Sequence, residues 1–111
     1  LSILFNRFYP KVNILILNII NMKNRSRNEI IAFILESVSN SKSSNGITAT
    51  KIMYSAFLSY SQLKEYLVLL LDKDLLEYYP NTQTYKVTYK GTHYLSIHKQ
   101  LIEMIVKPTY H

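Results

Sequence analysis

Cysteine and tryptophan are absent from this 111-residue chain, which also contains only two glycines and three prolines. The absence of cysteine excludes a disulfide scaffold, a thiolate metal site and a cysteine nucleophile, and it leads us to expect an intracellular, cytoplasmic protein. Because hydrophobic residues make up 48% of the chain and Gly and Pro are few, we expect a globular body. This length favours one domain with a single modest core.

Acidic residues are scarce: 7 Asp and Glu stand against 13 Lys and Arg, which gives a net charge of +6. Such a surplus favours polyanions as partners. Residues 1–21 contain no acidic residue and are rich in Leu, Ile and Asn. Their apolar run is shorter than the ~20 residues of a membrane span, and they lack the pattern of a signal peptide. We expect Met22 to be the natural initiator and residues 1–21 to be an N-terminal extension that is not native.

Two capping boxes predict the starts of helices. Ser26 with Glu29 precedes apolar residues at helical spacing (30, 31, 34, 35 and 38), and Ser59 with Gln62 precedes another such set (63, 67, 70 and 71). Between them, Thr48 is the predicted N-cap of a short helix, and the polar segment 39–46 is predicted to be a mobile loop. The short connection at 56–58 then makes the second and third helices a helix-turn-helix.

Two short runs rich in β-favouring residues follow, at 75–79 and 84–88, around a Pro-Asn turn, and they predict a β-hairpin. From Gly91 onward, apolar residues trace one face of a last helix of about sixteen residues that Pro108 ends. The expected fold is α+β and mainly helical, a winged helix-turn-helix with three helices, a β-hairpin wing and a C-terminal helix. Residues 22–90 would form the winged-helix domain, and residues 91–111 the C-terminal helix and tail.

With these motifs the chain resembles archaeal winged-helix DNA-binding proteins, which include small dimeric chromatin-type proteins and predicted transcriptional regulators. The residues that carry the resemblance are 23–31, 50–54, 58–60, 62, 63, 66, 67, 70 and 85–91. The resemblance implies a winged-helix fold, binding of double-stranded DNA and dimerisation through the last helix, with no enzymatic activity and no cofactor. Where the family usually has Gly after the recognition helix, this chain has Asp74, which we expect in the left-handed conformation.

In a winged helix the N-terminal half of the third helix lies in the major groove, while basic side chains of the arm and the wing contact phosphates. Gln62 has two interpretations here: it reads adenine by paired hydrogen bonds, or it is held in the Ser59 cap. Each lysine or arginine likewise has the alternative of being ordinary solvated surface. The predicted DNA-binding residues are Lys23, Arg25, Arg27, Thr50, Lys51, Ser59, Tyr60, Ser61, Gln62, Lys64, Lys86 and Lys90.

Other side chains also allow more than one interpretation. The tyrosines of the third helix and the hairpin either stack on single-stranded bases or pack in the fold. His93 and His98 have a poor spacing for metal ligands, so no metal site is expected. The apolar face of the last helix either forms a homodimer or covers the first helix; its predicted dimerisation residues are Tyr94, Leu95, His98, Leu101, Ile102 and Ile105.

The sequence therefore supports two functional hypotheses. The first is a double-stranded DNA-binding protein, acting as a transcriptional regulator or a chromatin-type architectural factor. The second is a protein-interaction module in which the winged helix is a scaffold and the last helix pairs with a partner. Acidic residues around the third helix, such as Glu65 and Asp72, favour the second hypothesis.

Overall fold

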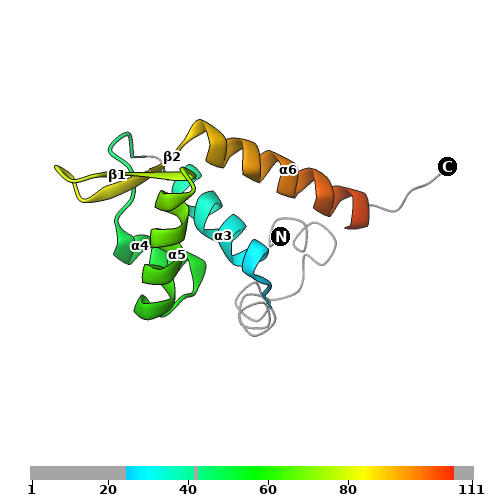
Figure 1. The fold of residues 1–111 in the computed structure, drawn as a ribbon, viewed down its shortest axis with the longest axis horizontal. Helices are drawn as coiled ribbons and strands as arrows, with labels where there is room; N and C mark the ends of the chain where they lie inside the picture. Colours follow the sequence, from blue (N-terminus) through cyan, green and yellow to red (C-terminus); the bar gives the residue numbers. More distant parts are fainter. Residues whose placement is uncertain (1–24, 42, 107–111) are drawn as a thin grey trace.

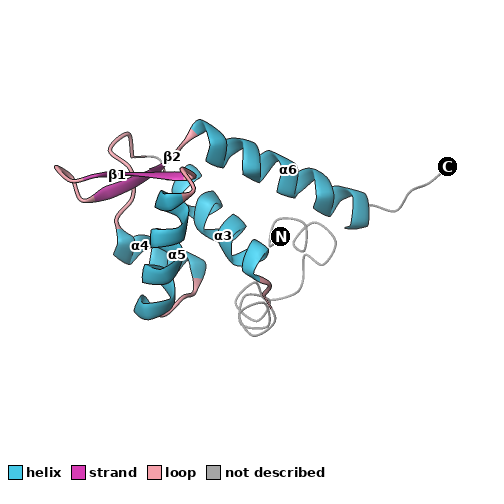
Figure 2. Ribbon diagram, viewed as in Figure 1, coloured by secondary structure: helices cyan, strands magenta, loops and turns pink. Residues whose placement is uncertain are grey.

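The computed structural model describes residues 25–41 and 43–106, which form four helices and a two-stranded hairpin (Figure 1). In chain order the elements are α3 (Arg27–Ser39), α4 (Ala49–Ala56), α5 (Tyr60–Asp72), β1 (Leu76–Tyr79), β2 (Thr84–Val87) and α6 (Tyr89–Val106). This order confirms the mainly helical winged helix-turn-helix predicted from the sequence, with the hairpin at one end of the helices (Figure 2). The predicted extension 1–21, the proposed initiator Met22 and Lys23 lie outside the described residues.

Helices α3, α4 and α5 begin at the positions that their capping residues predicted. Ser26 and Glu29 exchange two hydrogen bonds of 3.2 Å at the start of α3, and Thr48 Oγ1 accepts a 3.3 Å bond from the amide of Lys51 at the start of α4. Ser59 caps α5 in the same way as Ser26 caps α3. These side chains satisfy amides that would otherwise have no partner at a helix N-terminus.

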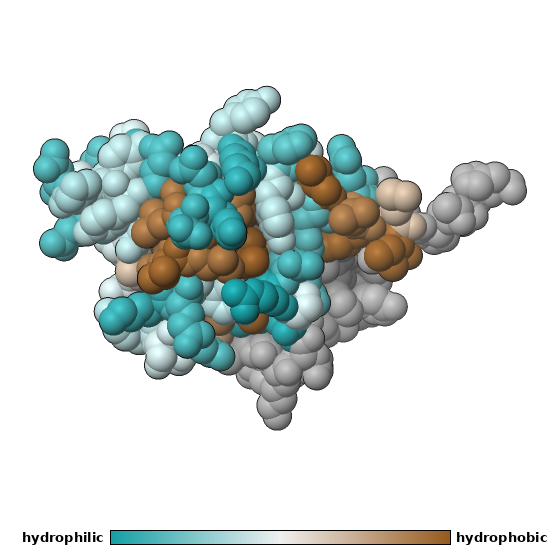
Figure 3. All heavy atoms as spheres, in the orientation of Figure 1, coloured by the Kyte–Doolittle hydropathy of each residue, from teal (hydrophilic) through white to brown (hydrophobic). Residues whose placement is uncertain are grey.

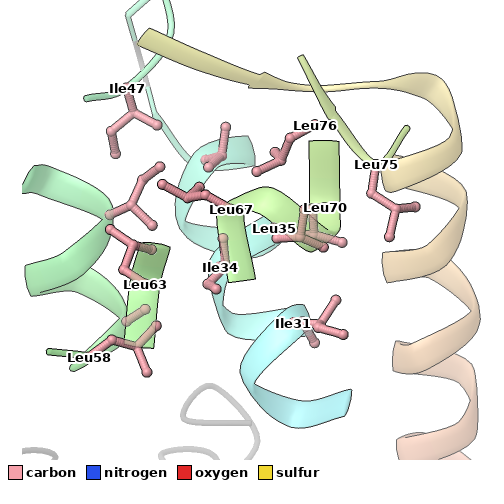
Figure 4. Close-up of a cluster of buried hydrophobic side chains, with 14 of the residues drawn as sticks. Ile31, Ile34, Leu35, Ile47, Leu58, Leu63, Leu67, Leu70, Leu75 and Leu76 are labelled. Carbon is pink, nitrogen blue, oxygen red and sulfur yellow. The ribbon is translucent and has the colours of Figure 1, made fainter. Parts of the chain in front are cut away.

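Helices α3 and α5 supply most of the core, and α4, the hairpin and α6 close around them (Figure 4). Ile34, Leu35, Ile52 and Leu70 are among the core residues that are completely buried. Burying an aliphatic side chain of this size contributes roughly 1.5–3 kcal/mol before the entropic cost of folding. The buried apolar residues are Ile31, Ala32, Ile34, Leu35, Val38, Ile47, Ile52, Ala56, Leu58, Leu63, Leu67, Leu70, Leu75, Leu76 and Leu95.

The hairpin pairs Leu76 with Val87 and Tyr78 with Tyr85, and Ile47 adds an antiparallel bridge to Tyr85. The sequence prediction missed this bridge, since Ile47 stands alone between a polar loop and a helix cap. The C-terminal part of the loop predicted to be mobile is held against the hairpin. Gly46 has a φ of +91°, and a Cβ at this position would lie 2.6 Å from the Tyr85 carbonyl oxygen, so a side chain does not fit here.

Helix α6 starts at Tyr89, earlier than the predicted Gly91, and has 18 residues. Thr88, predicted to end the strand, instead caps the helix, because its Oγ1 accepts a 3.0 Å hydrogen bond from the amide of Gly91. Asp74, between α5 and β1, has the left-handed φ of 64° that was expected of it. None of the helices in the described part of the chain combines the length and apolarity needed to cross a membrane.

Candidate nucleic-acid interface

The outer face of α5 begins with exposed residues, as a recognition helix requires. Tyr60 is 67% exposed, and Ser61, Gln62 and Lys64 are exposed in the turns that follow. Glu65 stands beside Lys64 and offsets its charge. Further along the helix Val68 is 64% exposed, and an apolar area covers this part of the molecular surface (Figure 3). Val68 is not among the DNA-binding residues predicted from the sequence.

Gln62 is engaged in the cap of α5. Its Oε1 accepts a 3.0 Å hydrogen bond from the amide of Ser59, while its own amide donates 3.2 Å to Ser59 Oγ. Bidentate recognition of adenine needs both the oxygen and the nitrogen of a glutamine side chain. The structure therefore agrees with the interpretation of Gln62 as a capping residue. Ser59, which was also predicted to bind DNA, has its hydroxyl engaged in the same cap.

Arg25, predicted to contact phosphate, makes its hydrogen bonds to other parts of the protein. Its guanidinium donates 2.6 Å to the carbonyl oxygen of Ala56 and 3.1 Å to that of Phe57, and it lies 5.0 Å from the centre of the Phe33 ring. Burial lowers the pKa of Arg25, against the opposing effect of Glu29. Two nitrogens of the guanidinium thus hold the C-terminal end of α4, which gives Arg25 a role within the fold that the sequence did not predict.

Lys90 has a similar role at the C-terminal end of α5, the second helix of the helix-turn-helix. Its Nζ donates a 2.8 Å hydrogen bond to the carbonyl oxygen of Lys73, the C-cap residue of α5. A cation is favourable there because the last carbonyl groups of a helix carry partial negative charge. Lys90 is exposed, yet its amine is directed to the end of α5. Arg25 and Lys90, both predicted to contact phosphate, thus donate to carbonyl groups at the C-terminal ends of α4 and α5.

The other predicted residues are distributed over three elements. The guanidinium carbon of Arg27 lies 5.7 Å from the centre of the Tyr66 ring. The amine nitrogen of Lys86 lies 5.0 Å from the centre of the Tyr79 ring. Thr50 and Lys51 are exposed in the first turn of α4. Charge is nearly balanced on this part of the molecule, since residues 25–41 and 43–106 hold eight of the 13 Lys and Arg and all seven Asp and Glu.

The tyrosines of the hairpin divide between its two faces. Tyr78 and Tyr85 are paired across the strands, with ring centres 4.9 Å apart. Burial raises the pKa of the Tyr85 phenol, and the nearby phenols of Tyr78 and Tyr60 raise it further. On the opposite face Tyr79 donates a 2.5 Å hydrogen bond to Glu77, which raises the pKa of Tyr79.

The apolar face of α6 is divided between the core and solvent. Leu95 is 6% exposed and packs in the core, with Tyr94 partly buried against it, so this part of the face covers α3 within one chain. In the second half of the helix Leu101 and Ile105 are 54% and 82% exposed. An apolar area marks that half of α6 (Figure 3). Of the predicted dimerisation residues, Leu95 is therefore part of the core of one chain, whereas Leu101 and Ile105 are accessible to a partner.

His98 lies where α6 packs on α3. Its ring stacks on Tyr94 at a centre-to-centre distance of 6.4 Å, and Nε2 is buried without a hydrogen-bond partner. Burial lowers the pKa of His98, with Glu29 and Glu36 acting in the opposite direction. Within the described ranges, His, Asp and Glu side chains do not gather into a group of three that could hold a metal ion.

The geometry agrees with the comparison to known proteins. The profile of the winged helix-turn-helix family matches residues 24–106, which include α3, the α4–α5 pair, the hairpin and α6. Comparison with curated proteins finds no match. The winged helix-turn-helix domain suggests DNA as a partner. Since the profile spans most of the sequence and the corresponding elements are present, the chain belongs to the winged helix-turn-helix family.

Proposed function

We propose that this protein binds double-stranded DNA, acting as a cytoplasmic transcriptional regulator or chromatin-type architectural factor and not as an enzyme. The observation that carries the proposal is the exposed N-terminal half of α5, the second helix of a helix-turn-helix that a β-hairpin follows. An exposed helix of this kind fits the major groove, and the adjacent hairpin meets the backbone. The resemblance to archaeal DNA-binding proteins supports the same function.

The side chains on α5 favour binding that tolerates many sequences. Gln62 has its oxygen in the cap, and the positive charge of Lys64 is offset by Glu65. Val68 offers only apolar contact, such as with the methyl group of thymine. Few donors and acceptors therefore remain for base recognition. Affinity would come mainly from phosphate contacts, which carry no sequence information of their own.

The cations available for phosphate are fewer than the sequence suggested. Arg27, Lys51 and Lys64 are exposed, and Lys86 is half-buried at the hairpin. Lys23, in the arm before α3, is a further candidate outside the described residues. Each phosphate that a cation neutralises steepens the fall of log affinity with log salt by about 0.9 for duplex DNA.

A duplex titration at two salt concentrations tests the proposal. We expect binding at low salt that weakens steeply as salt rises. Lys51→Gln should lower the slope by about 0.9 if this lysine neutralises one phosphate. Glu103→Gln on α6, which removes one charge of the opposite sign far along the chain from α5, serves as the control. Absence of binding at low salt, or binding that salt does not change, would reject DNA binding.

A protein-interaction module is the second candidate, and the exposed Leu101, Met104 and Ile105 of α6 favour it. Apolar residues that gather on a surface commonly mark a contact with another protein. We propose a homodimer through this surface, which is compatible with either function. Selection of bound sequences from a random duplex pool distinguishes a regulator, which enriches a motif, from an architectural factor, which enriches none.

A further inference from the structure

A groove with a volume of about 510 Å³ lies between α3 and α4, which pack against each other. Sites for small organic molecules have volumes of roughly 300–1,000 Å³, so this groove is large enough for one. Two of its lining residues are apolar: Phe33 is half-buried and Ile47 is buried, and we call them the apolar floor. The other lining residues are polar, namely Glu36, Ser37, Asn40, Ser41, Lys51 and Ser55.

Two of the serines of the groove already form hydrogen bonds within the protein. Ser37 Oγ donates 2.8 Å to the carbonyl oxygen of Phe33, and Ser41 Oγ accepts 3.3 Å from the amide of Ser43. The polar side chains best placed to meet a ligand are therefore the other four of the lining.

These four side chains form two pairs of different charge. Glu36 and Asn40 are four positions apart at the C-terminal end of α3, and Lys51 and Ser55 are four positions apart on α4. Residues at this spacing lie on the same face of a helix. One side of the groove therefore presents a carboxylate and an amide, and the other presents an amine and a hydroxyl. We call Glu36 with Asn40 the α3 wall, and Lys51 with Ser55 the α4 wall.

We propose that this groove binds a free α-amino acid with an apolar side chain. The amine and the hydroxyl of the α4 wall donate hydrogen bonds to the carboxylate of the ligand, and the α3 wall accepts hydrogen bonds from its ammonium group. The apolar side chain of the ligand lies on the apolar floor. Only a ligand with both charges finds a partner of opposite sign at each wall. This inference goes beyond the proposed DNA binding and does not depend on it.

Three related ligands test the proposal on the unaltered protein. L-Leucine carries both charges, L-leucinamide lacks the carboxylate and isocaproate lacks the ammonium group, while all three have the same apolar chain. We expect L-leucine to bind at millimolar concentration and each analogue to bind roughly tenfold more weakly, because each loses a charge-assisted hydrogen bond. In an NMR titration the amide shifts that change should be those of α3 and α4.

Three results of this titration would overturn the proposal. Equal binding of L-leucine and either analogue would show that the apolar floor alone holds the ligand. Absence of any shift change at tens of millimolar L-leucine would show that the groove does not bind it. Shift changes that centre on another part of the molecule would place the ligand elsewhere.

Substitution of one charge at a time assigns the two walls. Glu36→Gln should weaken L-leucine binding roughly tenfold and leave isocaproate binding unchanged, since isocaproate has no ammonium group. Lys51→Gln should likewise weaken L-leucine binding and leave L-leucinamide binding unchanged. Glu103→Gln and Lys99→Gln are the matched controls, because both residues are exposed on α6 and neither lines the groove. Equal weakening in a control and in its matched groove variant would contradict the assignment.

Lys51 also connects the groove to the proposed DNA binding, and this last step rests on that function. A carboxylate bound to Lys51 cancels its charge, so saturating L-leucine should lower the salt slope of duplex binding by about 0.9 in the wild type and leave it unchanged in Lys51→Gln. An unchanged wild-type slope would overturn this coupling. If the wild-type protein does not bind duplex DNA, the proposed function fails, whereas the NMR titration still decides whether the groove binds an amino acid.

Discussion

Arg25 donates a 2.6 Å hydrogen bond to the carbonyl oxygen of Ala56, across 31 positions of the sequence. Ala56 is the last residue of α4, and Phe57 after it adopts the left-handed conformation that turns the chain toward α5. The bond therefore ties the segment before α3 to the turn of the helix-turn-helix. Because this turn sets the direction in which α5 leaves α4, Arg25 is a positioning residue for the recognition helix.

Arg25→Lys should destabilise the fold by roughly 1–3 kcal/mol, the cost of leaving carbonyl groups without their donors. Lysine keeps the charge, but a single amine does not reproduce the two-pronged contact of a guanidinium or its packing on Phe33. Denaturant unfolding, with the midpoint compared to that of the wild type, measures the effect.

Arg27→Lys is the matched control, because Arg27 is exposed at the start of α3. Its stability should stay within about 0.5 kcal/mol of the wild type. A wild-type unfolding midpoint for Arg25→Lys would refute the structural role. Salt titrations of DNA binding add a second comparison: Arg27→Gln should reduce the slope, whereas Arg25→Gln should leave it unchanged.

The sequence predicted the fold well where a signal is local. The caps formed by Ser26, Thr48 and Ser59 each use atoms within three positions, so the residue types alone locate the helix starts. Ile47 was misjudged for the opposite reason, because its bridge to Tyr85 joins residues far apart in the sequence. Thr88 was misjudged although its cap is local, since its Oγ1 accepts from the amide of Gly91, three positions later.

The candidate site was harder to predict than the fold, because the use of a cation depends on tertiary contacts. Arg25 and Lys90 resemble any other surface cation in the sequence, yet both donate to the carbonyl groups of helix ends. Gln62 was the exception, since its capping box with Ser59 is local and was one of the two interpretations considered.

His98 should make the fold less stable as the pH falls. Burial lowers its pKa in the folded state below the ordinary value of 6.5. Below about pH 6.5 the unfolded chain therefore binds a proton that the folded chain resists, so stability rises with pH in this window. The contribution is fully present above pH 6.5 and is lost as the pH falls through the folded-state pKa. Denaturant unfolding between pH 5 and 7.5 should show this slope.

His98→Gln removes the titrating group and should flatten that slope. His93→Gln, which replaces an exposed histidine on the same helix, should retain the wild-type slope. The carboxylates of Glu29 and Glu36 favour the protonated form of His98, so their effect is opposite to that of burial. Equal slopes for His98→Gln and the wild type would show that His98 does not govern the pH dependence.

Gly91→Ala should loosen α6 from the rest of the fold. Gly91 lies directly against the Leu75 carbonyl group, and a Cβ there would also meet Val87 at 2.7 Å. Both the turn after α5 and α6 would have to shift, and we expect a loss of roughly 1–3 kcal/mol in the free energy of unfolding. Alanine favours helices over glycine, so an increase in stability would contradict the close packing.

The C-terminal end of α6 is where we expect a homodimer contact. Leu101 and Ile105 are one helical turn apart and exposed, beyond the part of α6 that packs on α3. Leu101→Glu would place a charge in an apolar contact between two chains, which costs several kcal/mol when the charge has no partner. Sedimentation should therefore show a dimer for the wild type and a monomer for Leu101→Glu.

Ser96→Glu is the control for this experiment, because it adds the same charge at another exposed position of the helix. Positions 96 and 101 are about 140° apart around the helix, so the added charge of the control points away from Leu101 and Ile105. Ser96→Glu should remain dimeric at concentrations where Leu101→Glu is monomeric. A wild-type protein that sediments as a monomer at high micromolar concentration would reject the dimer, and equal dissociation of both variants would show an effect of charge alone.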